Sequence, residues 1–292
     1  MHPAPLGTNI NYVEAMITLE ERVRSPIVEG LFYPEEAAEV LAYMHSIGLE
    51  RGKGGMARAI IAPHGAWEIS GSLAGAAFAS AMGRIGVISP SRVVIMGPIH
   101  DNRVDGVFLS NSHSFQTPLG DILVDQDISG ELESRSSYFT VNDIPHLQEH
   151  SIEVLLPFIK YSFPHASIVP ILMGRPKKLH IFALARALRE VLEPIIEDTL
   201  LVVSFNLIEY PGKTEASAMA GEYIQLFKEG RRLELSMSLQ DGRITSCGGA
   251  LVAALLQSGL VNTMRPRLVS QSLLSAYGEQ DKTVYYGAFS FE

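Results

Sequence analysis

Three short runs of the sequence are apolar at every position, and they limit what the chain can fold into. These runs are Ala59–Ala62, Val93–Met96 and Leu200–Val203. A strand with one face in water alternates apolar and polar residues, whereas a strand covered on both faces is apolar throughout. The runs therefore predict the central strands of a sheet that is buried on both sides.

Other β-rich runs alternate with helical patterns along the chain. The full set of β-rich runs is Arg58–Ala62, Arg92–Met96, Val107–Ser110, Ile122–Val124, Ser167–Met173, Leu200–Ser204 and Val284–Phe291. The amphipathic stretches typical of helices are Pro34–Gly48, Gly71–Met82, Ser151–Tyr161, Lys178–Ile196, Thr214–Lys228 and Gly248–Gln257. This alternation predicts an α/β protein, with a central, mixed but mainly parallel sheet between two helical layers in a three-layer α/β/α fold.

The sequence gives no sign of a domain boundary. It has no repeat, no low-complexity segment and no Pro/Ser-rich linker. We therefore predict a single domain over residues 1–292. Within it, the short strands and turns of Asp101–Asn142 indicate an insertion or antiparallel excursion, and the aromatic run Val284–Phe291 indicates a strand nearer an edge.

Composition argues against several classes of function. The chain has 23 Lys and Arg against 32 Asp and Glu, a net charge of −9, so we expect no nucleic-acid partner. Because no long apolar run or signal-peptide pattern occurs, we expect a cytoplasmic protein with no membrane partner. The single cysteine, Cys247, excludes an intrachain disulfide and a zinc site built mainly from thiolates.

Two histidines follow predicted central strands at equivalent places. His64 lies in Ala62-Pro63-His64-Gly65, and His100 lies in Gly97-Pro98-Ile99-His100. Ligands of α/β sheets collect at the carboxyl ends of the strands. A lone loop histidine is usually structural, but a pair from neighbouring strand ends favours a metal site with two imidazole ligands.

Two further residues are candidates for the same cleft. Cys247 precedes Gly248 at the start of an apolar stretch, where a helix dipole would favour a metal-binding thiolate; the ordinary interpretation is a small buried side chain. Glu209 follows the strand Leu200–Ser204 and could be a ligand or a proton carrier, although such a glutamate is more often simply solvated.

A rival hypothesis comes from His146-Leu147-Gln148-Glu149-His150, which matches the H-x-x-E-H pattern of one class of zinc protease. That chemistry needs both histidines on one helical turn. Pro145 indicates that a helix only begins here, and Pro157 interrupts its continuation. A five-residue pattern is also common by chance.

An ordered set of motifs across most of the chain resembles the MEMO family, whose bacterial and archaeal members are also called AmmeMemoRadiSam system protein B. The motifs are Arg24–Pro34 (RSPIVEGLFYP), Ala62–Trp67 (APHGAW), Ser70–Gly71, Gly97–His100 (GPIH), Thr117–Gly120 (TPLG), Glu149–Val154 (EHSIEV), Leu156–Phe158 (LPF), Ile168–Ile171 (IVPI) and Cys247–Gly248. Each motif is weak alone, but their order is specific.

The resemblance implies a fold similar to the LigB-like class III extradiol dioxygenases, which hold non-haem iron. It implies that His64 and His100 are metal ligands, with Cys247 where the dioxygenases use a carboxylate. The implied metal is iron, with copper or zinc as alternatives, and His150 would line the same cleft. If oxygen chemistry takes place there, we expect His150 or Glu209 to move protons. It also implies a functional link to AMMECR1-like and radical-SAM proteins.

The chain departs from the family pattern after the strand Leu200–Ser204. Asn206 stands where the family has aspartate, Glu209 stands where it has histidine, and Trp67 replaces a frequent tyrosine. These changes would reduce activity. Two functions therefore remain ahead of the protease: a metal-dependent, dioxygenase-like oxidoreductase, and a non-catalytic protein that binds a small molecule or peptide in the cleft.

Overall fold

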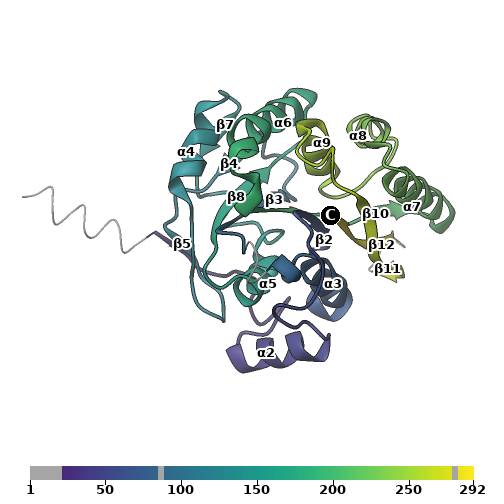
Figure 1. Cartoon of the computed structure of the whole chain (residues 1–292). Helices are drawn as coiled ribbons and strands as arrows, with labels where there is room; N and C mark the ends of the chain where they lie inside the picture. Colours follow the sequence, from purple (N-terminus) through teal and green to yellow (C-terminus); the bar gives the residue numbers. More distant parts are fainter. Residues whose placement is uncertain (1–21, 85–88, 278–281) are drawn as a thin grey trace, which may run out of the picture.

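A large central sheet runs through the computed structural model, which describes residues 22–84, 89–277 and 282–292 (Figure 1). Four parallel strands form its centre, in the spatial order β2 (Ala59–Ala62), β9 (Thr199–Ser204), β3 (Arg92–Pro98) and β8 (Ser167–Met173). All residues of β2 and β9 are buried. The three wholly apolar runs are therefore central strands, as predicted.

Antiparallel pairing extends the sheet at both sides. At one side β12 (Lys282–Phe291) lies between β11 (Pro266–Tyr277) and the strands β2 and β10 (Ile208–Pro211). At the other side β4 (Val107–Leu109) pairs antiparallel to β8, and β7 (Phe139–Val141) pairs parallel to β4. The aromatic run is thus one strand in from an edge, and the predicted excursion turns back along β8 to enlarge the main sheet.

Three short strands lie in a separate sheet that ties the start of the described chain to this excursion. They are β1 (Val23–Arg24), β5 (Ser114–Phe115) and β6 (Ile122–Leu123). The pairing places Arg24 beside Phe115. This position lets the Arg24 side chain enter the interior.

Helices cover both faces of the main sheet (Figure 1). One layer holds α2 (Ala37–Ser46), α3 (Ser72–Ala79) and α5 (Leu156–Ser162). The other holds α4 (Gln126–Ser134), α6 (Lys178–Leu192), α7 (Lys213–Lys228), α8 (Arg232–Gln240) and α9 (Gly249–Ser258). Along β2, Ile60 packs into the first layer and Ile61 into the second, so the predicted three-layer α/β/α fold is confirmed.

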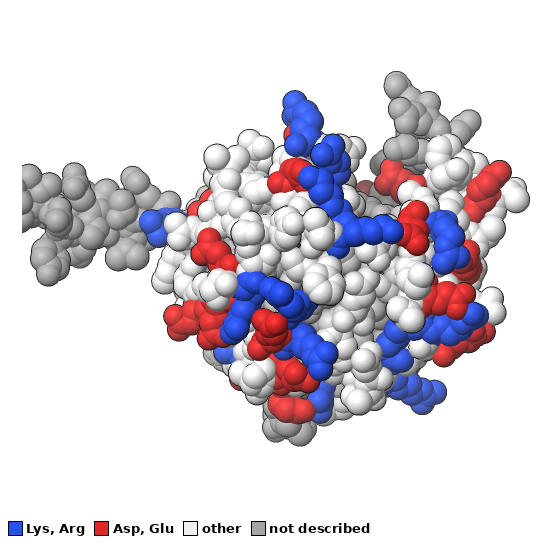
Figure 2. All heavy atoms as spheres, turned by 90° about the horizontal axis from the view of Figure 1, so that it is seen from above, with Lys and Arg blue, Asp and Glu red and all other residues white. Residues whose placement is uncertain are grey.

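Short turns of other helix types complete the described chain. They are η1 (Trp67–Gly71), η2 (Met82–Arg84), η3 (Glu153–Leu155) and η4 (Glu193–Asp198). Within the described ranges, no helix combines the length and the apolar content that crossing a bilayer requires. On the face shown in Figure 2, basic and acidic side chains are intermixed.

Candidate metal centre

His64 follows β2 and is almost completely buried, with 1% of its surface exposed. Its backbone N–H donates to Asn206 Oδ1 at 3.1 Å, and its Nδ1 lies 2.7 Å from Ser204 Oγ. Its Nε2 is buried without a hydrogen-bond partner. Burial, together with the nearby His100 and His150, lowers the pKa of His64 well below its usual value, so the ring is neutral at physiological pH.

His100 follows β3 and is held by Glu149. The backbone N–H of His100 donates to Glu149 Oε2 at 2.7 Å, and its Nδ1 lies 2.9 Å from Oε1. Its other ring nitrogen, Nε2, lies 3.4 Å from Cys247 Sγ. Burial acts to lower the pKa of His100, but the contacts with Cys247 and Glu149 together raise it to about 10.

Cys247 is placed by a short backbone contact just before α9. The N–H of Asn206 donates to the Cys247 carbonyl at 3.0 Å. The next residue, Gly248, has a φ of +88°, and a Cβ there would lie 2.4 Å from the Ser204 carbonyl oxygen. Only glycine fits this close approach, which brings the Cys247 loop against the end of β9.

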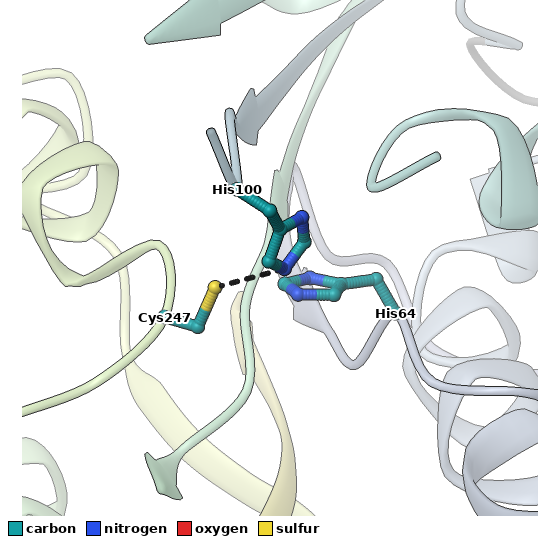
Figure 3. Close-up of side chains that lie close together, drawn as sticks. All are labelled: His64, His100 and Cys247. Atoms are coloured by element: carbon teal, nitrogen blue, oxygen red, sulfur yellow. Dashed lines mark hydrogen bonds between the residues drawn. The ribbon is translucent and has the colours of Figure 1, made fainter. Parts of the chain in front are cut away.

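The three residues His64, His100 and Cys247 point toward one another (Figure 3). Each offers one ligand atom, and these atoms lie within 4.8 Å of one another. One detail of the prediction is wrong: the histidines do not follow neighbouring strands, because β9 lies between β2 and β3. The structure nevertheless brings together the residues expected to bind metal.

A cleft of about 380 Å³ opens beside these side chains. Its lining includes His100, Cys247 and Glu209, together with the apolar Ile99 and Met173. Glu209 lies in β10, opposite Val284 of β12. The predicted proton carrier Glu209 therefore shares a cleft with two of the three candidate ligands.

His150 lies against the ring of His100. The two rings are stacked, with centroids 4.6 Å apart and planes 9° apart, and the Phe32 ring meets His150 edge-on. Burial lowers the pKa of His150. With Glu149, these two histidines form a second group whose ligand atoms lie within 4.8 Å of one another. His150 thus joins the cluster mainly by packing on His100.

Glu149 holds the His100 ring and its neighbouring backbone, a contact that the sequence analysis missed. Its carboxylate is 4% exposed and accepts hydrogen bonds from the N–H groups of His100, His150 and Ser151, and from the His100 ring. Burial acts to raise its pKa, but the contacts with His100 and Ser151 lower it to about 2. Glu149 is therefore a fixed, ionised acceptor that orients His100.

This arrangement does not support the protease alternative. Residues 144–148 form a turn and Glu149 and His150 are in irregular structure, so the helical turn that the H-x-x-E-H chemistry needs is absent. The ring of His146 is buried and meets Phe115 edge-on. Glu149, the base in that hypothesis, is already occupied by its donors.

A buried ion pair holds the loop that contains His146 and Glu149. Arg24 pairs with Glu153, and both side chains are 1% exposed. The Arg24 guanidinium also donates to the carbonyl oxygens of His146 and Glu149, at 2.9 and 3.0 Å. The N-terminal motif and the EHSIEV motif are thus two sides of one contact, which the sequence analysis did not identify.

The departures from the family pattern fall at structurally different places. Asn206 contacts the backbone of both His64 and Cys247, so it joins two candidate ligands. Trp67 is buried among aromatic rings and donates its indole N–H to the Val154 carbonyl. Trp67 therefore serves the core, whereas Asn206 and Glu209 belong to the site.

Comparisons with known proteins agree with the motif pattern. The family profile described as "Memo-like protein" matches residues 24–290. A MEMO1 family protein of Pyrobaculum aerophilum is 30% identical over 286 residues, which cover 92% of this chain and 99% of that protein. A MEMO1 family protein of Thermotoga neapolitana is 30% identical over 252 residues, covering 81% of this chain and 88% of that protein.

One solved structure gives a weak match. The crystal structure of an uncharacterized protein from Escherichia coli K12 superposes with a TM-score of 0.44 and 12% identity, covering 80% of this chain and 99% of that chain.

The family profile spans nearly all described residues, and both archaeal and bacterial relatives match over most of their length. The predicted resemblance is thereby confirmed, and the chain belongs to the Memo-like protein family.

Proposed function

We propose that this protein binds a transition-metal ion through His64 Nε2, His100 Nε2 and Cys247 Sγ. The observation that carries the proposal is that His64, His100 and Cys247 each offer a ligand atom within 4.8 Å of the others, and that His64 Nε2 is buried without a hydrogen-bond partner. A buried polar atom without a partner costs about 1–3 kcal/mol. A metal ion at this point would satisfy that nitrogen.

The donor set favours a borderline or soft metal. Two imidazoles and one thiolate suit iron, copper and zinc. We propose iron, in line with the family's likeness to non-haem iron dioxygenases, and keep copper and zinc as alternatives. The proton that His100 shares with Cys247 would leave on binding, because a ligating thiolate and imidazole nitrogen must both be free of protons.

The cleft supports a role for a small ligand beside the metal. Its volume of about 380 Å³ lies within the range of small-molecule sites. Bound iron would supply oxygen-dependent redox chemistry to such a ligand. Glu209 lines the cleft and would hold or move a proton there, whereas His150 would steady the His100 ring.

A non-catalytic binding protein is the second candidate. Its support is the chain's own departure from the family, since Glu209 stands at the position of the family histidine and Asn206 at that of the aspartate. In this role the cleft would hold a metabolite or peptide without turnover. For either candidate function we propose a cytoplasmic location and a functional link to AMMECR1-like and radical-SAM proteins.

Elemental analysis of protein purified without added metal tests the metal site. We expect near-stoichiometric metal in the unaltered protein and its loss in His64→Ala and Cys247→Ala. The control is His165→Ala, which removes an exposed imidazole outside the cluster. Full occupancy in both cluster variants would show that the proposed ligands are wrong.

Oxygen uptake then separates the two candidate functions. Iron-loaded protein is offered a panel of catechols, and uptake that depends on His64 supports the oxidoreductase. An absence of turnover by fully loaded protein favours the binding protein.

A further inference from the structure

The Ser204 hydroxyl lies between a histidine ring and a backbone carbonyl. Ser204 ends β9 and is fully buried. Its Oγ is 2.7 Å from His64 Nδ1 and 2.6 Å from the carbonyl oxygen of Ser151. A hydroxyl group has only one proton to donate, and a carbonyl oxygen can only accept.

These two contacts determine where the protons lie. The Ser204 proton must point to the Ser151 carbonyl, because otherwise two bare oxygen atoms would face each other at 2.6 Å. The Ser204 oxygen then accepts a hydrogen bond from His64, so the Nδ1 of His64 carries the ring proton. The other ring nitrogen, Nε2, keeps its lone pair.

We propose that Ser204 is a positioning residue that fixes the tautomer of His64, with Nδ1 protonated and Nε2 bare. Its link to metal binding rests on the proposed function, because Nε2 is the nitrogen that would meet the metal. A partner on the far nitrogen of an imidazole commonly sets the tautomer and ring orientation of a metal ligand. The partner here is a neutral hydroxyl, whereas His100 has a carboxylate.

Ser151 supports both arrangements from one place. Its carbonyl accepts the Ser204 proton, its N–H donates to Glu149 Oε1 at 2.8 Å, and its hydroxyl donates to the Pro98 carbonyl at 2.7 Å. The loop after Glu149 thus connects the partner of His64 with the partner of His100. Ser151 itself is fully buried.

The backbone packs closely around Ser151 and Ser204. A Cβ at Gly97 would lie 2.6 Å from Ser151 Oγ, and a Cβ at Gly248 would lie 2.4 Å from the Ser204 carbonyl oxygen. Removing the Ser204 hydroxyl would remove the acceptor that the Nδ1 proton of His64 has in this structure. A shift of the proton to Nε2, where Cys247 Sγ is near, then becomes competitive.

Nitrogen NMR of the metal-free protein tests the tautomer directly. With ¹⁵N-labelled histidine at neutral pH, the signals that disappear in His64→Asn belong to His64. We expect the protonated signal from Nδ1 and the bare signal from Nε2. The opposite assignment in the unaltered protein would overturn the proposal, and this result does not depend on whether metal binds.

Ser204→Ala tests the cause. We expect a population of the Nε2-protonated tautomer and a roughly 10–100-fold loss of affinity for zinc alone, measured against a chromophoric chelator. Ser238→Ala, which removes a buried hydroxyl without a partner in α8, is expected to change neither quantity. Ser204→Thr keeps a hydroxyl and is expected to restore the tautomer.

Each result has a separate meaning. An unchanged tautomer in folded Ser204→Ala overturns the positioning role, and an altered tautomer with unchanged zinc affinity overturns its link to the metal. If Ser204→Ala does not fold, the tautomer of His64 in the spectrum of the unaltered protein still supports or overturns the proposal. The predicted tautomer in a protein that binds no metal at His64 would refute the proposed function but not the role of Ser204.

Discussion

His64 and His100 occupy equivalent places in the sequence but different environments in the structure. His64 is 1% exposed and contacts a neutral hydroxyl, whereas the His100 side chain is 41% exposed and contacts the ionised Glu149. Their pKa values are shifted in opposite directions. Equivalent positions after two strands therefore do not produce equivalent side-chain environments.

The difference shows what each histidine contributes. His64, buried and neutral, offers a bare nitrogen whose place is fixed by the interior. His100 lines the cleft, and its carboxylate partner increases the basicity of the ring. In the proposed metal centre, His64 would be the buried ligand and His100 the ligand at the open side.

The largest expected effect comes from weakening the loop that supports both His64 and His100. Arg24 holds the loop that supplies both Glu149 and Ser151, and it is itself fully buried against Glu153. Arg24→Met leaves the Glu153 charge without its partner, which should lower the free energy of unfolding by about 3–5 kcal/mol. Urea unfolding followed by circular dichroism measures this loss.

The control for this change is Arg103→Met, which removes an exposed arginine paired with Asp101. An exposed pair contributes little, so we expect the midpoint of unfolding to stay nearly unchanged. Equal effects of Arg24→Met and Arg103→Met would mean that the buried pair does not hold the loop.

The next effect concerns His100 alone. Glu149→Gln replaces the carboxylate by an amide, which cannot accept from all of the surrounding N–H donors. We expect a loss of about 1.5–3 kcal/mol of stability, and a lower pKa of His100 because its anionic partner is gone. Urea unfolding and NMR titration measure the two quantities.

The His64 ring provides the internal control in the same Glu149→Gln sample. Its tautomer should persist, because its partner is Ser204. A change at His64 as large as that at His100 would mean that the Ser151 loop shared by both histidines, rather than Ser204, sets the His64 tautomer.

The predictability of the fold followed the strength of each local pattern. The predicted strand Ser167–Met173 has the same bounds as β8, in which every residue after Ser167 is buried. The helix α8 was missed. Its apolar residues Leu233, Leu235, Met237 and Leu239 alternate as in a strand, yet only Leu235 and Leu239, four residues apart, are buried in the helix.

The site was predictable only where a single residue carried the signal. His64, His100 and Cys247 could be named from their places near predicted elements and from the family motifs. The position of β9 between β2 and β3 depends on long-range pairing, which no local pattern records. Ser204 and Glu149 were missed for the same reason, since each acts on a histidine far away in the sequence.

The pH dependence of metal-free protein separates the two histidines by sign. The folded-state pKa of His64 lies below the unfolded value near 6.5, so its contribution falls as the pH drops below about 6.5. The folded-state pKa of His100 is about 10, so its contribution is fully present below about 6.5 and is lost as the pH rises toward 10. Urea unfolding should therefore show stability that falls as the pH drops below about 6.5 and falls again as the pH rises toward 10.

Single substitutions assign the two sides. His64→Gln should flatten the acidic side of the profile and His100→Gln the alkaline side, while His165→Gln, an exposed control, should change neither. If both cluster variants altered the same side, the opposite environments of the two histidines would be refuted.

The smallest expected effect concerns the His64 side alone. Asn206→Asp restores the family residue, and a carboxylate oxygen can still accept the N–H of His64 while the backbone bond to Cys247 is kept. Because the geometry persists, we expect less than about 1 kcal/mol of change in stability, within the effect of a single hydrogen bond. Zinc affinity should likewise change less than in Glu149→Gln, since no ligand loses its partner. A larger loss in Asn206→Asp would mean that the amide, rather than its contact with the backbone, is what this chain requires beside His64.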